Sequence, residues 1–264
     1  MIDLHHHLLW GLDDGASNLE TSLTMARIAA ADGITHVVCS PHANGRYAYQ
    51  PQVIAEKIGE LQQLLDREHL SLKLGHGCDF HLSYDNIAEA KADPARFSIN
   101  GLGYLLVEIP DYGLPLALTE TFYELQLLGL TPILTHPERN PTLQTDQRRL
   151  AEWLQGGVLI QVTAGSVVGR MGKQAERMAH KLLADRWVHF LATDAHNTTS
   201  RPPKMREAFD LVAKKYDPEY ARLLCISNPL AAFMGKPLQQ QMEPLHLYDD
   251  LEKNWWQRLV ERIR

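Results

Sequence analysis

Residues 1–14 of the chain read MIDLHHHLLWGLDD, an apolar start that changes directly into three histidines. This pattern is typical of a buried strand whose last residues reach a polar site. Alternate side chains of a strand share a face, so His5 and His7 point the same way, about 7 Å apart along the strand, and His6 points away. Two imidazoles on one face can bind one metal ion, and Asp14 can return from the following loop as an oxygen ligand. A purification tag is a longer histidine run followed by a linker, and these flanks are strand-like instead.

Seven short apolar runs alternate with stretches of helical periodicity, at residues 2–7, 35–40, 70–75, 104–107, 131–135, 158–162 and 188–193. Nearly continuous apolar runs are typical of parallel strands that are covered on both faces, and the alternation with helices implies right-handed crossovers. Six of the seven runs are followed by His, Asp or Glu. A β/α barrel builds its sites at this C-terminal edge, whereas an open doubly wound sheet uses fewer strands. The pattern therefore predicts an α/β fold with a closed or nearly closed barrel of seven strands.

The polar residues at the strand ends are imidazoles and carboxylates, without a cysteine. They are His5, His7, Asp14, His42, Asp79, Glu108, His136, Asp194 and His196. Nitrogen and oxygen ligands suit divalent Mn, Fe or Zn. These residues exceed what one ion can use, so we expect two or three ions with a carboxylate that bridges neighbouring ones. Histidines inside predicted helices or strands have an ordinary structural or surface role, and these are His36, His69, His180 and His189.

The composition favours a soluble globular protein. The chain has 264 residues, of which 45 % are hydrophobic, enough for a full core. A net charge of -6 leaves no basic field, so we expect no nucleic-acid partner. No apolar run approaches membrane-spanning length, and no signal-peptide pattern precedes the first strand. Three widely spaced cysteines, Cys39, Cys78 and Cys225, suggest a reducing compartment, so we expect a cytoplasmic protein.

The last part of the chain differs from the rest. Residues 1–237 carry the strand and helix alternation, and residues 238–264 form a separate tail. Apolar side chains recur at helical spacing near its end, at Leu251, Trp255, Leu259 and Ile263. We expect an amphipathic helix that docks on the barrel or on a neighbouring subunit, so an oligomer formed through the tail is an open possibility. Acidic residues in this helix argue against membrane insertion.

Several motifs occur together in the chain: His5-x-His7, Pro41-His42, Glu108, His136-Pro137-Glu138-Arg139, Asp194-Ala195-His196 and Arg201-Pro202-Pro203. They resemble the polymerase-and-histidinol-phosphatase (PHP) superfamily, and within it the bacterial manganese-dependent protein-tyrosine phosphatases of capsule and exopolysaccharide operons. The resemblance extends from residue 1 to about residue 237. It implies a distorted (β/α)7 TIM-like barrel, the PHP fold, with Mn2+ as the expected metal. It also implies an enzyme that hydrolyses phosphotyrosine in proteins by attack of metal-bound hydroxide.

The resemblance also implies how the ligands are shared among three ions. One ion would be held by His5, His7, Glu108 and Asp194. Glu108 would bridge to a second ion, with Asp79 and His136 nearby. The third ion would be held by Asp14, His42 and His196. The family more often has a glutamate where this chain has Asp79, whose carboxylate reaches less far.

Two arginines are the expected phosphate ligands. Arg139 and Arg201 carry planar guanidinium groups, which suit bidentate contacts with phosphate oxygens. The alternative role of each is an ion pair that stabilises the rim of the site. Cys39 lacks the glycine-rich turn and the arginine of a cysteine-dependent phosphatase, so we expect it to be a packing residue.

Two other functions remain open. One is a small-molecule phosphatase, such as a histidinol-phosphate phosphatase, and the other is a non-catalytic metal-stabilised module that docks to a partner. The complete ligand set favours an enzyme over the module. The substrate implied by the resemblance is the phosphotyrosine-containing tail of a protein such as a bacterial tyrosine kinase. A loop with Arg46, Tyr47 and Tyr49, all expected to be exposed, is a candidate to receive that tail.

Overall fold

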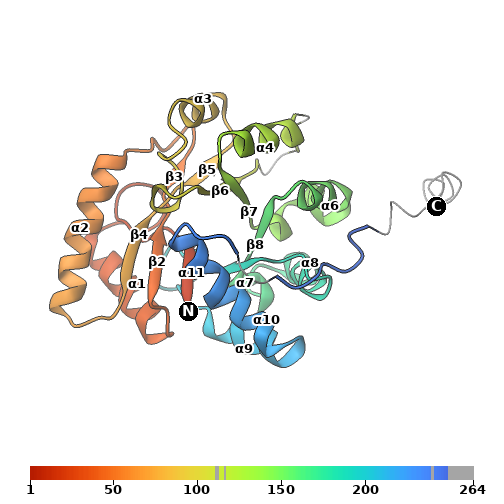
Figure 1. Ribbon diagram of the computed structural model, residues 1–264. Coiled ribbons are helices and arrows are strands. Elements are labelled where there is room, and N and C mark those ends of the chain that lie inside the picture. The colour runs from red at the N-terminus through yellow and green to blue at the C-terminus, as the bar shows by residue number, and fades with distance from the viewer. Residues whose placement is uncertain (111–112, 116, 239–240, 249–264) are drawn as a thin grey trace, which may run out of the picture.

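The seven apolar runs lie side by side as parallel strands in the computed structural model of the chain, which describes residues 1–110, 113–115, 117–238 and 241–248 (Figure 1). The strands are β1 (Ile2–His6), β2 (His36–Cys39), β3 (His42–Ala43), β4 (Lys73–His76), β5 (Asp79–His81), β6 (Tyr104–Glu108), β7 (Thr131–Thr135), β8 (Leu159–Thr163) and β9 (Phe190–Ala192). Every described pairing between neighbouring strands is parallel. The predicted α/β class is therefore confirmed.

Two of the seven predicted strands are interrupted, which the sequence analysis did not foresee. β2 and β3 are separated by Ser40 and Pro41, and β4 and β5 by Gly77 and Cys78. Proline has no N–H to donate to a neighbouring strand, and a Cβ on Gly77 would lie 2.7 Å from Val38 Cγ1. Because of these two breaks, the strands form two sheets. One is ordered β1-β2-β4 and the other β3-β5-β6-β7-β8-β9.

The ring of strands closes between β1 and β9. The backbone N–H of His7 donates to the Ala195 carbonyl at 3.0 Å, and the Asp194 N–H donates to the His5 carbonyl at 2.9 Å. A single parallel bridge joins His6 to Ala195. The buried Asp3 carboxylate adds a bond from the Thr193 N–H at 2.9 Å. Closure through so few bonds makes this a distorted barrel, as predicted.

The interior of the barrel is apolar, except at the C-terminal ends of the strands. Tyr104 and Leu106 of β6 point inward with Ile133 of β7 and Phe190 of β9. Side chains two residues apart in a strand share a face, so Glu108 continues the inward row of β6 at its C-terminal end. The inward-facing positions of the strands therefore carry apolar side chains inside the barrel. At the C-terminal ends of the strands, the same inward-facing positions carry candidate metal ligands.

Helices surround the strands (Figure 1). They are α1 (Leu19–Ala31), α2 (Pro51–Arg67), α3 (Tyr84–Ala92), α4 (Leu118–Leu127), α5 (Pro141–Thr145), α6 (Arg148–Gln155), α7 (Ala164–Val167), α8 (Lys173–Ala184), α9 (Arg206–Lys215), α10 (Pro218–Arg222) and α11 (Asn228–Phe233). Short turns of helix complete the set, namely η1 (Ile99–Gly101), η2 (Pro137–Arg139) and η3 (Leu223–Ser227). None of the helices in the described ranges combines the length and the hydropathy needed to cross a bilayer.

Residues 241–248 lie along the barrel. The Leu245 N–H donates to the Asp185 carbonyl at 2.8 Å, and Trp187 Nε1 donates to the Leu245 carbonyl at 2.9 Å. Leu247 is buried in the core. The amphipathic helix predicted for residues 251–264 lies outside the described residues.

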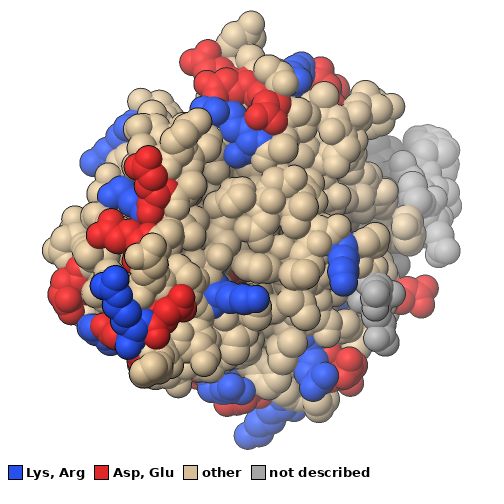
Figure 2. Space-filling view, turned by 60° about the vertical axis from the view of Figure 1, so that its left-hand side comes forward, with Lys and Arg blue, Asp and Glu red and all other residues tan. Residues whose placement is uncertain are grey.

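Charged side chains of both signs are interspersed on one face of the molecule. On the face shown in Figure 2, blue Lys and Arg side chains alternate with red Asp and Glu around a largely uncharged centre. On this face, charges of both signs thus lie close to one another.

Candidate metal centre

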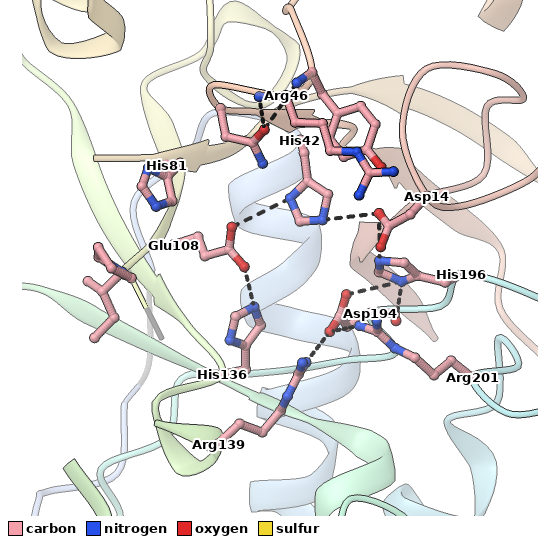
Figure 3. A pocket seen from close by; sticks show the side chains of 14 residues that line it. Asp14, His42, Arg46, His81, Glu108, His136, Arg139, Asp194, His196 and Arg201 are labelled. Atoms are coloured by element: carbon pink, nitrogen blue, oxygen red, sulfur yellow. Dashed lines mark hydrogen bonds and ion pairs between the residues drawn. The ribbon is translucent and has the colours of Figure 1, made fainter. Parts of the chain in front are cut away.

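Nine side chains meet at the C-terminal end of the barrel (Figure 3 shows six of them). Their ligand atoms form four overlapping groups, and within each group all atoms lie within 4.8 Å of one another. The groups are His7 with Asp14, His42 and His196; His5 with Asp79 and His136; His5 with His7 and Asp194; and His42 with Asp79 and Glu108. These are the nine residues that the sequence analysis selected. Within the described part of the chain, no further His, Cys, Asp or Glu belongs to such a group.

The two histidines of β1 are oriented by hydrogen bonds behind them. His5 Nδ1 lies 3.1 Å from Gln161 Oε1, and His7 Nδ1 lies 2.6 Å from Asp13 Oδ2. Because both partners are oxygen acceptors, each Nδ1 carries a proton, and each Nε2 is the atom that faces the centre and could bind a metal ion. The two Nε2 atoms lie 3.3 Å apart. The prediction that His5 and His7 face one site is in agreement with this geometry.

Asp13 organises the loop that carries Asp14, and sequence reasoning missed it. Its buried carboxylate also accepts the backbone N–H of Gly15 at 2.9 Å and of His42 at 3.1 Å. A Cβ on Gly15 would lie 2.3 Å from the His7 carbonyl oxygen, so the loop packs directly on the end of β1. The available signal was the position of Asp13 in the run Asp13-Asp14-Gly15. Gln161, also missed, lies in β8, which corresponds to the one predicted run, of the seven, that is not followed by His, Asp or Glu.

Asp79 lies between two of the groups. Its Oδ2 atom is 3.3 Å from His5 Nε2 and 3.1 Å from His42 Nδ1. Glu108 Oε2 is 3.5 Å from His42 Nδ1, and Glu108 Oε1 is 3.8 Å from His136 Nε2. Asp79 therefore belongs to two groups and Glu108 to one, whereas the family resemblance implied Glu108 as the bridging carboxylate.

Two residues of the centre have a left-handed backbone. His136 follows β7 with a φ of 36°, and Asp194 follows β9 with a φ of 50°. Residues with a Cβ adopt this conformation uncommonly, and it costs free energy that the surrounding structure must offset. It turns the chain sharply at the barrel mouth, where both side chains enter the ligand groups.

Arg139 and Arg201 meet at one carboxylate. Both guanidinium groups donate to Oδ2 of Asp194 (Figure 3). Asp194 Oδ1 lies 3.5 Å from His5 Nε2 and 3.4 Å from His7 Nε2, on the other side of the carboxylate. Both arginines thus form the ion pairs that were considered as their alternative role. Both arginines also line the pocket above the centre, with side chains that are 32 % and 26 % exposed.

The histidines and carboxylates of the centre shift one another's pKa values strongly. Burial lowers the pKa of His5, but the Asp79 and Asp194 carboxylates outweigh it and raise that pKa to about 9. Burial is likewise outweighed at His42, where Asp79 and Glu108 raise the pKa to about 11. Burial raises the pKa of Asp79 and Asp194, but the facing histidines hold both well below their usual range. Carboxylates that keep their charge in a buried site attract cations, and a metal ion competes with the histidine protons.

Unsatisfied atoms in the centre fit divalent cations. Asp79 Oδ1 and Oδ2 and His42 Nδ1 are buried without a hydrogen-bond partner among the described residues. The 3.1 Å approach of His42 Nδ1 to Asp79 Oδ2 lacks hydrogen-bond geometry, as is usual for two ligands of one ion. Buried polar atoms are nearly always satisfied, so these atoms suit metal coordination. The donors are nitrogen and oxygen, and all three cysteines are free and buried elsewhere.

Two other expectations concern residues near the centre. Cys39 is fully buried, and burial raises the pKa of its thiol, as expected for a packing residue. The expectation that Tyr49 is exposed is wrong, because its side chain is buried and its hydroxyl donates to the Gly77 carbonyl at 3.2 Å. Tyr49 thus supports the break between β4 and β5. Of the other loop residues, Arg46 is exposed and Tyr47 is half-buried.

The family model of capsular polysaccharide synthesis proteins, CpsB/CapC, matches residues 1–234 of the chain. The chain belongs to the CpsB/CapC family. Tyrosine-protein phosphatase YwqE of Bacillus subtilis is 33 % identical over 225 residues, which cover 85 % of this chain and 88 % of that protein. The putative tyrosine-protein phosphatase CapC of Staphylococcus aureus is 32 % identical over 211 residues, covering 80 % and 82 %. The resemblance stated from the sequence motifs is confirmed.

Solved structures agree with this family membership. A structure from the work on YwqE of Bacillus subtilis and CpsB of Streptococcus pneumoniae, described as unique metal-dependent tyrosine phosphatases, matches with a TM-score of 0.86 and 30 % identity. The match covers 93 % of this chain and 98 % of that one. The lactonase Lmo2620 of Listeria monocytogenes, at a TM-score of 0.57 and 11 % identity, shares the fold alone.

Proposed function

We propose that this chain is a metal-dependent phosphatase that hydrolyses phosphotyrosine in proteins. The observation that carries the proposal is the pocket in which two arginines face four overlapping groups of metal-ligand type. A phosphate monoester dianion needs positive charge at its oxygens and a nucleophile at neutral pH. The CpsB/CapC family membership and relatives named tyrosine-protein phosphatases support the same reaction.

The nine residues of the four groups are the proposed metal ligands, and Mn2+ is the proposed metal, with Fe and Zn as alternatives. Hard and borderline donors without thiolate favour such ions. Because Asp79 belongs to two groups, we propose it as a bridging carboxylate alongside Glu108. When bound, divalent cations supply positive charge to the phosphate oxygens and lower the pKa of a coordinated water to roughly 7.

The residues of the chain hold the phosphoryl group for attack. Arg139 and Arg201 are fixed on one side by Asp194, so their remaining N–H groups are preorganised towards the pocket. Preorganised donors stabilise the charge that develops on the phosphoryl oxygens without reorganising during the reaction. Both arginines therefore have two roles in this proposal, as partners of Asp194 and as ligands of the phosphate.

The proposed substrate is the phosphotyrosine-containing tail of a protein such as a bacterial tyrosine kinase, within capsule or exopolysaccharide regulation. The family description, capsular polysaccharide synthesis, supports this setting. A cytoplasmic location is part of the proposal, supported by three free cysteines.

The test is a turnover assay with Mn2+ that compares a phosphotyrosine peptide, histidinol phosphate and a simple aryl phosphate. We expect the highest kcat/KM for the peptide. Faster turnover of histidinol phosphate would keep the phosphatase activity and replace the substrate. Absence of turnover on all three, with metal bound, would point to a non-catalytic module.

A further inference from the structure

The wall of the pocket has two halves of different chemistry. On the side of β7 and β9 it carries Arg139 and Arg201, and on the side of β3 and β6 it carries Tyr47, Ile109 and Pro110. The pocket has a cavity volume of ≈ 370 Å³, within the range of clefts that bind small ligands. A ligand that is anionic at one end and apolar next to that end would match both halves.

Tyr47 is held firmly in its half of the wall. Asn44 Oδ1 accepts the backbone N–H groups of Arg46 at 2.9 Å and of Tyr47 at 3.1 Å, and the Asn44 N–H donates to the Tyr47 carbonyl at 3.0 Å. The Tyr47 ring lies nearly parallel to the His42 imidazole, with ring centroids 6.1 Å apart and an interplanar angle of 15°. The backbone that carries Tyr47 is thus held by hydrogen bonds, and its half-buried ring lies beside His42, a member of the ligand groups.

Arg46 differs from the other two arginines of the pocket. Its guanidinium lies 5.0 Å from the centroid of the Tyr47 ring. Among the described residues, no carboxylate lies within ion-pair distance of Arg46, whereas Arg139 and Arg201 both bind Asp194. In Figure 3, Arg46 lies beyond His42, across the pocket from those two. An exposed positive charge therefore stands at the mouth of the pocket, next to an aromatic wall.

We propose that Tyr47 and Arg46 form a subsite that binds the phenyl ring of phosphotyrosine and a carboxylate beside it in the peptide. The inference rests on the function proposed above. With the phosphate between the metal ligands and Arg139, the ring extends towards the mouth, where Tyr47, Ile109 and Pro110 supply aromatic and aliphatic contacts. A phosphoserine has no ring to place there. Arg46 then lies where the side chains next to the phosphotyrosine pass.

The ring contact is tested on the full-length, Mn2+-loaded protein with one peptide that carries either phosphotyrosine or phosphoserine. Tyr47→Ala is expected to lower kcat/KM for phosphotyrosine about tenfold more than for phosphoserine. Tyr47→Phe keeps the ring and is expected to retain the preference. Tyr123→Ala is the matched control, since Tyr123 on α4 is 61 % exposed and does not line the pocket.

Inhibition gives the same comparison without turnover. The ratio of the inhibition constants of phenylphosphonate and methylphosphonate is expected to shift about tenfold in Tyr47→Ala. Equal losses on the aryl and alkyl compounds would mean that Tyr47 only supports His42, and the subsite would be rejected. If the wild-type protein prefers histidinol phosphate to the peptide, the proposed function fails, whatever the variants do. If phosphotyrosine is preferred and Tyr47→Ala leaves the ratio unchanged, only the subsite fails.

The charge contact is tested with peptides that carry Glu or Gln beside the phosphotyrosine. The wild-type protein is expected to prefer Glu about threefold at low ionic strength, and the preference should decrease as salt is added. Arg46→Gln is expected to abolish it. Arg170→Gln is the control, because Arg170 pairs with Glu207 outside the pocket. An equal loss on both peptides in Arg46→Gln would show that Arg46 contacts the phosphate instead.

Discussion

Asp13→Asn removes one negative charge behind the metal centre and leaves the side-chain shape almost unchanged. Burial raises the pKa of Asp13, but the neighbouring His7 and the bonds from backbone N–H groups hold it below its usual range, so the carboxylate is ionised at neutral pH. Its 2.6 Å contact with His7 Nδ1 is a charge-assisted hydrogen bond. An asparagine has a single carbonyl oxygen: in the place of Oδ2 it still accepts from His7 and His42 as a neutral group, while its NH2 group faces the Gly15 N–H.

The expected magnitude follows from that change in charge. A hydrogen bond to a charged group contributes about 1.5–3 kcal/mol and a neutral one about 0.5–1.5 kcal/mol, a difference of about 1–1.5 kcal/mol, or roughly five- to tenfold in an equilibrium constant. Loss of an outer partner of a ligating histidine typically weakens metal binding about 10–100-fold. We therefore expect the Kd for Mn2+ to rise at least about tenfold, measured by calorimetric titration of metal-free protein. At saturating Mn2+, kcat is expected to change much less.

A partly buried carboxylate outside the metal centre, that of Asp32, provides the control. Asp32 Oδ2 accepts the backbone N–H groups of Met205 at 2.6 Å and Arg206 at 2.8 Å, and Asp32 does not line the pocket. Asp32→Asn is expected to lower the Tm without a change in the Kd for Mn2+. If Asp13→Asn behaved in the same way, with a lower Tm and an unchanged Kd, Asp13 would be a structural residue only and the reasoning would be refuted.

Gly15→Ala is expected to lower both Tm and Mn2+ content, because the new Cβ would lie 2.3 Å from the His7 carbonyl oxygen, whereas Gly45→Ala, with nothing within 4 Å, should be neutral in both. Cys39→Ser is expected to retain most turnover of a phosphotyrosine peptide, and a dead variant with full metal content would contradict a metal-based reaction. Arg139→Ala should lose on the order of 10²-fold in kcat/KM while still binding Mn2+, and unchanged kinetics would exclude Arg139 as a phosphate ligand. Chelation of the metal should abolish turnover, and added Mn2+ should restore it; turnover that persists in metal-free protein, verified by elemental analysis, would disprove the metal dependence.

The sequence predicted the barrel and the nine candidate ligands for one physical reason. Apolar runs that alternate with helical periodicity produce parallel strands, and the carboxyl ends of parallel strands meet at one edge. A residue such as His136 or Asp194 can therefore be assigned to the common edge without knowledge of any distance. The first strand was the most informative, because period two in a strand puts His5 and His7 on one face.

Other features depend on contacts between segments that are far apart in the chain, and only the tertiary structure decided them. Gln161 binds His5 across 156 residues, and no local pattern marks a glutamine inside an apolar strand as a partner of a histidine. The sequence predicts that Tyr49 is an exposed loop residue. In the structure, however, its hydroxyl donates to the Gly77 carbonyl in the break between β4 and β5.

The position of Asp79 relative to the other ligands is decided in the same way. The family resemblance implied Glu108 as the bridging carboxylate, with Asp79 near the second ion. In the folded chain, however, Asp79 lies at the start of β5, 3.3 Å from His5 and 3.1 Å from His42. Periodicity determines which edge of the sheet a side chain reaches, whereas the strand breaks and the packing of neighbouring strands determine which two atoms meet there.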